Sequence, residues 1–348
     1  EVPRLLQPAL ALESPGQPPV IGCVVHRAGT LDSADSSTER QPSGTSLALL
    51  RHRNGEWAID GATLGSPAGS SYSSPHPLVG PDGAVSVLFQ ETQARTRDHL
   101  GCWVVDGGAV VPVDDDPSGA PKLGFSALWA DGTLHVAYAD GRDNPGQGAY
   151  LYYTASADPR QGFARSRRLD PPHPRAWQAP PQLAAQGGLL LIGSTALTHR
   201  YFPRAYRDKL RRHRVAGLYQ ALAYSREPVV WWSTDNGASF HRTDGIDDQD
   251  IEVSAGAVFA LPRDGRVAAV WSESRPVTRP PDLRWATAGG LSHRFTATRA
   301  FNPAPGDNSA EVLYDAVWLP DGALAALYKD MTPDGSAGLY LARSEPLE

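Results

Sequence analysis

The chain has 348 residues, of which 41% are hydrophobic and 20% are charged, a composition that suits a folded globular protein with a sizeable core. Its formal net charge of −6 argues against a general nucleic-acid-binding protein. No apolar run approaches the roughly 18 residues that a membrane-spanning helix needs, so we expect no membrane span.

Six strand–turn–strand patterns follow one another along the chain. Each has two apolar runs separated by a glycine turn, and Asp-Gly or a similar pair between apolar runs is the strongest short-range signal of a β-hairpin. The predicted hairpins cover 6–25, 73–89, 123–138, 179–193, 254–271 and 313–328, with turn glycines Gly16, Gly83, Gly132, Gly187, Gly265 and Gly322. A loop and a third strand follow each hairpin.

The third strand of the fourth repeat ends in a distinctive turn. Residues 233–240, Ser-Thr-Asp-Asn-Gly-Ala-Ser-Phe, match the Asp-box pattern Ser/Thr-x-Asp-x-Gly-x-Ser/Thr-Trp/Phe. Three other third strands also end on an aromatic residue: Trp57, Phe163 and Phe295. In such a turn Asp and Ser bond the turn's own backbone, Gly takes a positive φ, and the aromatic side chain fills the gap to the next sheet. We therefore interpret Asp235 as structural rather than catalytic.

A repeat in phase over the whole chain predicts the fold class. We expect an all-β protein, a six-bladed β-propeller of four-stranded antiparallel blades that forms one domain over 1–348. The blades are expected at about 5–66, 72–113, 122–171, 177–245, 250–302 and 308–348. Only three strands can be found in the sequence of the last blade, so either residues 1–5 supply its outer strand or it stays short.

The long loops between second and third strands should lie opposite the Asp-Gly turns, and they are rich in arginine. An insertion at about 195–228 contains the basic segment 199–214. Because the guanidinium group pairs bidentately with carboxylate or sulfate, we predict an anion-binding face. The candidate ligand-binding residues are Arg142, Arg200, Arg204, Arg275 and Arg279. The alternative for 199–214 is an amphipathic helix with a solvated basic face.

With its Asp box and phased hairpins, the chain resembles the sialidase (BNR-repeat) superfamily over essentially its whole length. Residues 302–330 look very like the family's final blade, where a Tyr before the Asp-Gly hairpin is the nucleophile, and the resemblance gives that role to Tyr314. The family's acid/base Asp, in the loop of the first blade, corresponds to Asp32 or Asp35. Of the family's three arginines, the resemblance carries over to Arg279.

Other family positions differ. Gln178 stands where the family has the Glu that activates the Tyr, and Gln cannot act as a general base. Leu6 or Gln7 replaces the first arginine and Ser194 the second, while Lys329 replaces the Glu after the final Leu-Tyr. These departures weaken the case for the family's standard mechanism.

His76 offers another chemistry, because it lies on a first strand, as does Tyr314. A His/Tyr pair, with an Arg that neutralises a uronate, would suit a polysaccharide lyase. We predict a divergent carbohydrate-active enzyme that cleaves an anionic glycan containing sialic or uronic acid, as a sialidase-like glycoside hydrolase with Tyr314, Asp35, Gln178 and His76 in its catalytic site. The alternatives are a polysaccharide lyase, a non-catalytic glycan-binding propeller and a protein-interaction platform.

The remaining signals are weaker. Cys23 and Cys102 do not have metal-ligand spacing and are either two buried thiols or a disulfide. Without an HExxH, GxSxG or CxxC motif or a phosphate-binding glycine loop, we expect no metal and no cofactor. The chain starts Glu-Val-Pro, so either a leader was removed or the chain was shortened, and we expect a secreted or periplasmic protein.

Overall fold

The structure is a computed structural model. It describes residues 5–11, 20–26, 45–53, 56–93, 97–143, 148–169, 180–199, 224–243, 246, 253–263, 266–274, 282–290, 295–296, 299–301, 312–331 and 337–346. The chain divides into two compact units, Glu1–Asp170 (unit 1) and Pro171–Glu348 (unit 2). No helix in the described part of the chain is long and apolar enough to cross a membrane.

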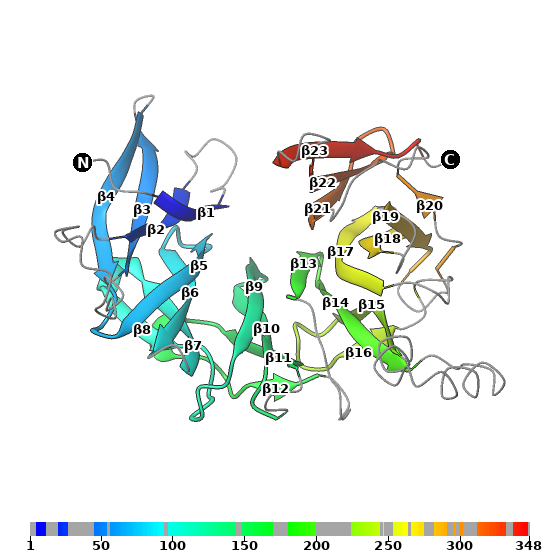
Figure 1. Ribbon diagram of the computed structural model, residues 1–348. Coiled ribbons are helices and arrows are strands. Elements are labelled where there is room, and N and C mark those ends of the chain that lie inside the picture. The colour runs from blue at the N-terminus through cyan, green and yellow to red at the C-terminus, as the bar shows by residue number, and fades with distance from the viewer. Residues whose placement is uncertain are drawn as a thin grey trace, which may run out of the picture. The chain divides into compact units, whose positions relative to one another are not determined.

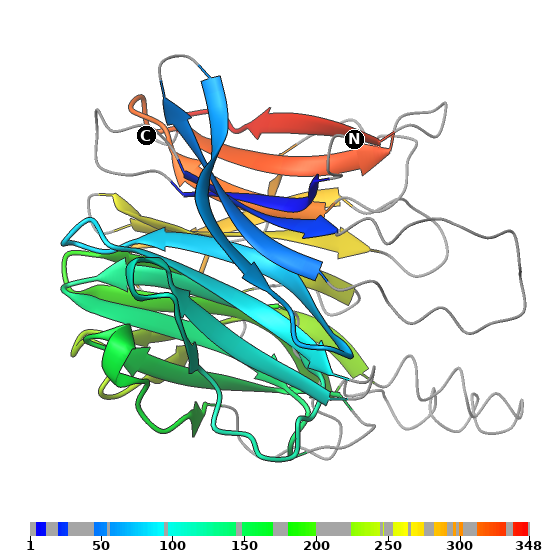
Figure 2. The same ribbon diagram turned by 90° about the vertical axis from the view of Figure 1, so that its left-hand side faces the viewer.

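The described residues of unit 1 form three four-stranded antiparallel sheets with their strands in chain order (Figures 1 and 2). The first contains β1 (Leu5–Ala11), β2 (Val20–His26), β3 (Thr45–Arg53) and β4 (Glu56–Gly65). The second contains β5 (Ser70–Val79), β6 (Val85–Gln93), β7 (Arg97–Val104) and β8 (Ala109–Pro112). The third contains β9 (Lys122–Ala130), β10 (Thr133–Asp140), β11 (Tyr150–Ser156) and β12 (Arg167–Arg168). The short 3-10 helices η1 (Val105–Gly107) and η2 (Pro159–Gln161) follow β7 and β11.

Unit 2 repeats the pattern in its described part, with two four-stranded sheets and one of three strands. The four-stranded sheets contain β13 (Gln182–Gln186), β14 (Leu189–His199), β15 (Tyr224–Ser233) and β16 (His241–Thr243), then β17 (Val253–Arg263), β18 (Arg266–Ser274), β19 (Asp282–Ala288) and β20 (Arg299–Ala300). The last sheet contains β21 (Val312–Trp318), β22 (Leu324–Met331) and β23 (Ala337–Arg343). The six predicted hairpins are confirmed, since each falls on two paired strands.

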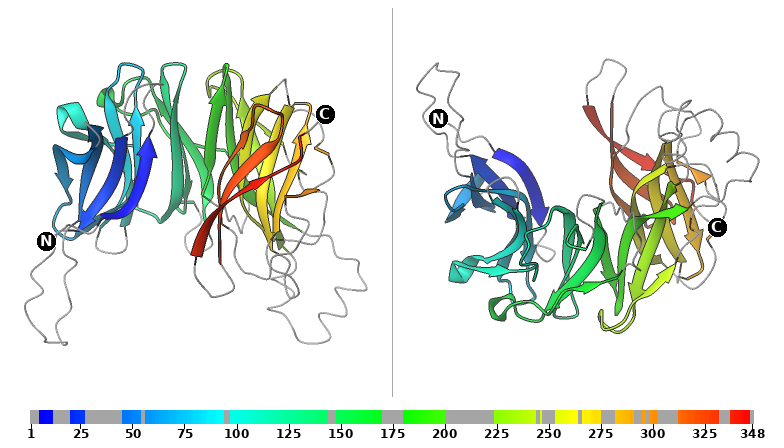
Figure 3. Two further views of the ribbon diagram at one scale, coloured as in Figure 1. Left: turned by 90° about the horizontal axis from the view of Figure 1, so that it is seen from above. Right: turned by 60° about the horizontal axis from the view of Figure 1, so that its bottom comes forward.

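Within each unit the sheets stand side by side (Figure 3), and buried side chains pack between neighbouring sheets. In unit 1 the first strand β5 contacts β1, β2 and β3, and β9 contacts β5 and β7. In unit 2 β17 contacts β13, β14 and β15, and β21 contacts β17 and β18. The first strands of consecutive sheets are therefore neighbours inside each unit.

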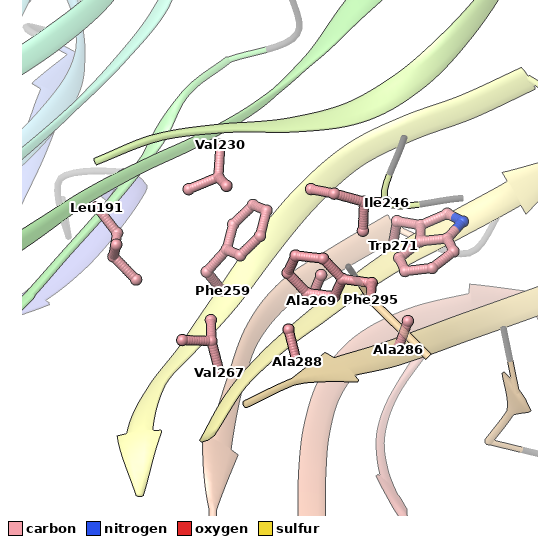
Figure 4. Close-up of a cluster of buried hydrophobic side chains, with 10 residues drawn as sticks. All are labelled: Leu191, Val230, Ile246, Phe259, Val267, Ala269, Trp271, Ala286, Ala288 and Phe295. Carbon is pink, nitrogen blue, oxygen red and sulfur yellow. The ribbon is translucent and has the colours of Figure 1, made fainter. Parts of the chain in front are cut away.

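The core lies between these sheets, because alternate residues of a strand face the same side. Figure 4 shows side chains of two sheets of unit 2 meeting around Phe259. Leu191 and Val230 come from one sheet, and Val267 and Trp271 from the other. A cluster of the same kind in unit 1 contains Leu47, Leu49, Tyr72, Val85, Val87, Phe89 and Trp103.

The hairpin turns have the geometry that the sequence predicts. Gly83, Gly132, Gly187 and Gly322 all have positive φ, between 56° and 86°. Asp131 also has a positive φ, of 46°, so both central residues of the Asp131–Gly132 turn adopt the left-handed backbone of a type I′ hairpin. The predicted turn glycines Gly16 and Gly265 lie outside the described residues.

The Asp box forms the predicted network of turn bonds. The carboxylate of Asp235 accepts hydrogen bonds from the backbone N–H of Ser239 (2.9 Å) and from its hydroxyl (2.5 Å). Ser233 Oγ donates to Asp235 Oδ1 (2.7 Å) and accepts from the N–H of Gly237 (2.8 Å). The bonds from Ser239 hold the pKa of Asp235 well below its usual value. All of these partners belong to the turn itself, which agrees with a structural role.

Two expectations need correction. The insertion predicted at about 195–228 is too wide, because β14 continues to His199 and pairs with β15 from Tyr224 onward; backbone pairing extends past the apolar run that marked the strand. The disulfide alternative is wrong for Cys102, which is a buried free thiol on β7.

Candidate functional site

The first strands of five sheets share an irregularity near their starts, at the end away from the hairpin turn. In each, one extra residue interrupts the pairing with the second strand: between Leu6 and Ala9, Ser73 and His76, Lys122 and Gly124, Ala255 and Ala257, and Leu313 and Asp315. Such β-bulges bend a strand, re-aim its side chains and are enriched beside active sites. We therefore take the residues in these bulges, or next to them, as candidate site residues.

His76 directly follows the bulge of β5. The bulge contains Ser74, whose φ of 52° is uncommon for a non-glycine residue, and Pro75. Pro77 follows, so the residues on both sides of His76 have no backbone N–H to donate. The half-buried imidazole reaches the next sheet, where its Nε2 lies 3.0 Å from the carbonyl oxygen of Ala127 on β9.

This bond fixes the tautomer of His76. A carbonyl oxygen can only accept, so Nε2 carries the proton and Nδ1 the lone pair of the neutral ring. Burial lowers the pKa of His76 below 6.5, and the bond to Ala127, which favours the protonated ring, does not offset it. At neutral pH the imidazole is therefore uncharged, and Nδ1 has a lone pair that can accept a proton. A neutral imidazole held in one tautomer is suited to general-base chemistry.

A buried charge network lies at the same end of the β9–β10 hairpin as the bulge. The side chain of Lys122, the first residue of β9, is 0% exposed. Its Nζ lies 2.9 Å from Asp116 Oδ2 and 3.3 Å from Asp140 Oδ2, and donates to the carbonyl oxygen of Ala120 at 2.8 Å. Gln90 of β6 donates to the Lys122 carbonyl (3.1 Å), which links the network to the sheet of His76.

The pKa values of Asp116 and Asp140 are shifted in opposite directions. Burial raises the pKa of Asp116, but hydrogen bonds from Ser118 and Lys122 more than offset it and hold that pKa well below 3.8. The pKa of Asp140 is raised, because burial outweighs its hydrogen bond with Arg142 and the charge of Lys122. Sequence reasoning missed this network. The only signal was the acidic run at 114–116 before a lysine that begins an apolar strand.

Arg142, predicted to bind ligand, belongs to the same network. Its guanidinium donates from Nε to Asp140 Oδ2 (2.8 Å), from Nη1 to Asp115 Oδ1 (2.5 Å) and from Nη2 to the Tyr138 hydroxyl (3.0 Å). It also lies 4.5 Å from the centre of the Tyr152 ring. All three nitrogens thus have protein partners, and a ligand anion would have to share them. Its ligand-binding role stays a prediction.

The other predicted site residues are less fully placed. Tyr314 is the extra residue in the bulge of β21, between Leu313 and Asp315. The rest lie outside the described residues: Asp32, Asp35, Gln178, Arg200, Arg204, Arg275 and Arg279. In the part of the chain that the structure describes, no three His, Cys, Asp or Glu side chains are grouped so that they could hold a metal ion.

No family model and no curated protein matches the chain. Several solved structures do resemble it. A polysaccharide lyase of family PL25, an ulvan lyase, superposes with a TM-score of 0.57 at 12% identity, covering 97% of this chain and 79% of the lyase. An α-L-arabinanase from Penicillium chrysogenum gives 0.52 at 14% identity, covering 100% and 96%. A protein of unknown function from Dyadobacter fermentans gives 0.52 at 14% identity, covering 80% and 81%.

The lyase and the arabinanase are carbohydrate-active enzymes with β-propeller folds. At such low identities the likeness concerns the fold alone, and a fold of this kind carries many activities. The chain is therefore an all-β protein, built from antiparallel sheets, whose fold resembles that of propeller enzymes acting on glycans.

Proposed function

We propose that the chain is a carbohydrate-active enzyme that cleaves an anionic polysaccharide by β-elimination, with His76 as the base. The observation that carries this proposal is the neutral, tautomer-fixed imidazole of His76 beside a bulge of a first strand. We further propose that the six sheets are the blades of one six-bladed propeller. This proposal is supported by the six hairpins in phase along the sequence, each of which falls on two paired strands.

The proton, the electron pair and the leaving group of the elimination step can each be assigned. His76 Nδ1 takes the proton from the carbon beside the uronate carboxylate. The electron pair left on that carbon forms the new carbon–carbon double bond as the bond to the leaving glycosidic oxygen breaks. That oxygen takes a proton, and Tyr314 is the proposed donor. A neighbouring cation must stabilise the carboxylate as its α-carbon loses a proton. Arg200, Arg204, Arg275 and Arg279 are the candidates for this role.

A sialidase-like hydrolase is the second candidate. It is supported by the sequence resemblance that gives Tyr314 the role of nucleophile, and by the bulge that this residue occupies in β21. Against it stands Gln178, since an amide cannot accept the proton that the tyrosine must lose. The replacement leaves His76 as the better supported base.

Product analysis separates the candidates. The protein is incubated with a uronate polysaccharide, such as ulvan, and with a sialylated oligosaccharide, and the products are weighed by mass spectrometry. Elimination yields fragments with an unsaturated, ultraviolet-absorbing uronate end and no added water. Hydrolysis yields fragments that carry one added water for each bond cleaved. Retention of the glycan without cleavage would reject both enzymes and indicate a glycan-binding protein.

A further inference from the structure

A pocket of about 310 Å³ opens in unit 1, away from the bulges. It lies between the turn that joins β5 to β6, the turn that joins β9 to β10, and the short helix η2. Its walls include Pro81 and Asp82 of the first turn, Trp129 at the end of β9, and Asp158 and Arg160 of η2 and its cap. His76 and Ala127 are not among the lining residues, so the pocket is distinct from the candidate site.

Trp129 supplies a flat apolar wall. Its indole is half-buried and lies against the backbone of the neighbouring turn, where a β-carbon built on Gly80 would be 3.6 Å from Cε2 of the ring. With Pro81 it forms a surface on which the C–H-rich face of a pyranose or furanose can pack. Tryptophan is enriched at sites where one side of a contact is apolar and the other is wet.

Polar groups surround this wall, and the turns hold them in place. Asp82 Oδ1 accepts from the N–H of Ala84 (3.0 Å), and Asp158 Oδ1 accepts from the N–H of Arg160 (3.0 Å). The Arg160 side chain is 50% exposed, and its Nη1 lies 4.0 Å from Asp158, beyond hydrogen-bond distance. Carboxylate oxygens accept from sugar hydroxyls, and a guanidinium donates to them.

Charge and size narrow the ligand class. Two carboxylates and one guanidinium give the lining a net charge of −1, which disfavours an anionic ligand. The volume lies at the lower end of the range for small-molecule sites, roughly 300–1,000 Å³, so the pocket suits one or two sugar rings. We propose that this pocket, which we call the turn pocket, binds a neutral sugar unit and anchors the polysaccharide apart from the cleavage site. This inference rests on the proposed function only in taking the ligand to be a sugar.

The test is saturation-transfer NMR with a set of neutral disaccharides built from glucose, galactose, xylose, arabinose and rhamnose. We expect transfer to at least one of them. Trp129→Ala and Arg160→Ala should each weaken its binding about tenfold, the loss expected for one good contact. Arg343→Ala is the control: Arg343 is likewise about half exposed (55%) and lies beside a turn carboxylate, that of Asp321, outside the pocket. This variant should bind like the unmodified protein.

The outcomes keep this proposal separate from the proposed function. Binding that persists in His76→Gln and is weakened in Arg160→Ala supports the turn pocket, whether or not the protein cleaves a polysaccharide. Arg160→Ala keeps the test valid if Trp129→Ala fails to fold, because the Arg160 side chain is half exposed and its removal should leave the fold intact. Absence of transfer to every disaccharide, or equal binding by Arg160→Ala and Arg343→Ala, would overturn the turn pocket and leave the role of His76 untouched.

Discussion

Replacing Lys122 by Met should destabilise the protein more than any surface charge change in unit 1. The ammonium group sits between two carboxylates, and the side chains of Lys122, Asp116 and Asp140 are all at most 2% exposed. Methionine keeps most of the length and the apolar character of the stem but removes the charged group. Both carboxylates then remain buried without their shared cation.

The expected loss can be worked out from the partners that remain. Removing one member of a buried ion pair typically costs about 3–5 kcal/mol, because the other charge stays desolvated. Asp140 keeps its ion pair with Arg142 at 2.7 Å, and Asp116 keeps hydrogen bonds from Ser118 and Ala120. The loss should therefore lie at the lower end of that range, about 3 kcal/mol.

Urea unfolding measures this directly, as a shift of the midpoint at constant slope. Arg168→Met is the control: Arg168 pairs with Asp143 at 2.7 Å, but these side chains are 30% and 43% exposed, so we expect a loss below about 1 kcal/mol. Adding Asp116→Asn to Lys122→Met should recover part of the loss, since it removes one unpaired charge. Equal losses in Lys122→Met and Arg168→Met would refute the reasoning.

Three further expectations concern His76, Asp235 and Phe259. Because the folded-state pKa of His76 lies below 6.5, its neutral ring stabilises the fold fully above pH 6.5 and progressively less as the pH falls toward the folded-state pKa. His76→Gln should therefore flatten the fall of the urea midpoint in this pH window. An unchanged pH profile of the urea midpoint would contradict the assignment. Asp235→Ala should lower the melting temperature while the folded fraction keeps its activity, and lost activity at an unchanged melting temperature would count against a structural box. Phe259→Ala should lower the free energy of unfolding in urea by about 3–5 kcal/mol, because the residue is 4% exposed and lies between two sheets. A decrease of less than about 1 kcal/mol would mean that the cluster of Figure 4 is not packed as described.

The sequence predicts the hairpins well because their signals are local. A type I′ turn needs a positive φ at both central residues, which Asp-Gly adopts more readily than most pairs. The structure shows positive φ at Asp131 and Gly132. The Asp box is local in the same sense, since its hydrogen bonds join Ser233, Asp235, Gly237 and Ser239. These elements could be found without knowing what surrounds them.

The chemistry of the site is harder to predict because it depends on contacts between distant segments. A lysine at the start of a strand suggests a surface residue, yet Lys122 is buried by carboxylates from 116 and 140. Arg142 suggests an anion-binding residue, and its acidic partners cannot be identified from spacing. His76 was selected from the sequence, but its tautomer depends on a carbonyl 51 residues away.

The rate of polysaccharide cleavage by His76→Gln tests the central claim most directly. The amide nitrogen of Gln can still donate to the Ala127 carbonyl, while the basic Nδ1 is lost. We expect kcat/KM to fall about 10²–10⁴-fold, the usual contribution of a general base, with substrate affinity and urea midpoint at pH 7 nearly unchanged. His241→Gln, which alters an exposed histidine of β16, should retain full activity. Equal activity of the two variants would contradict the account.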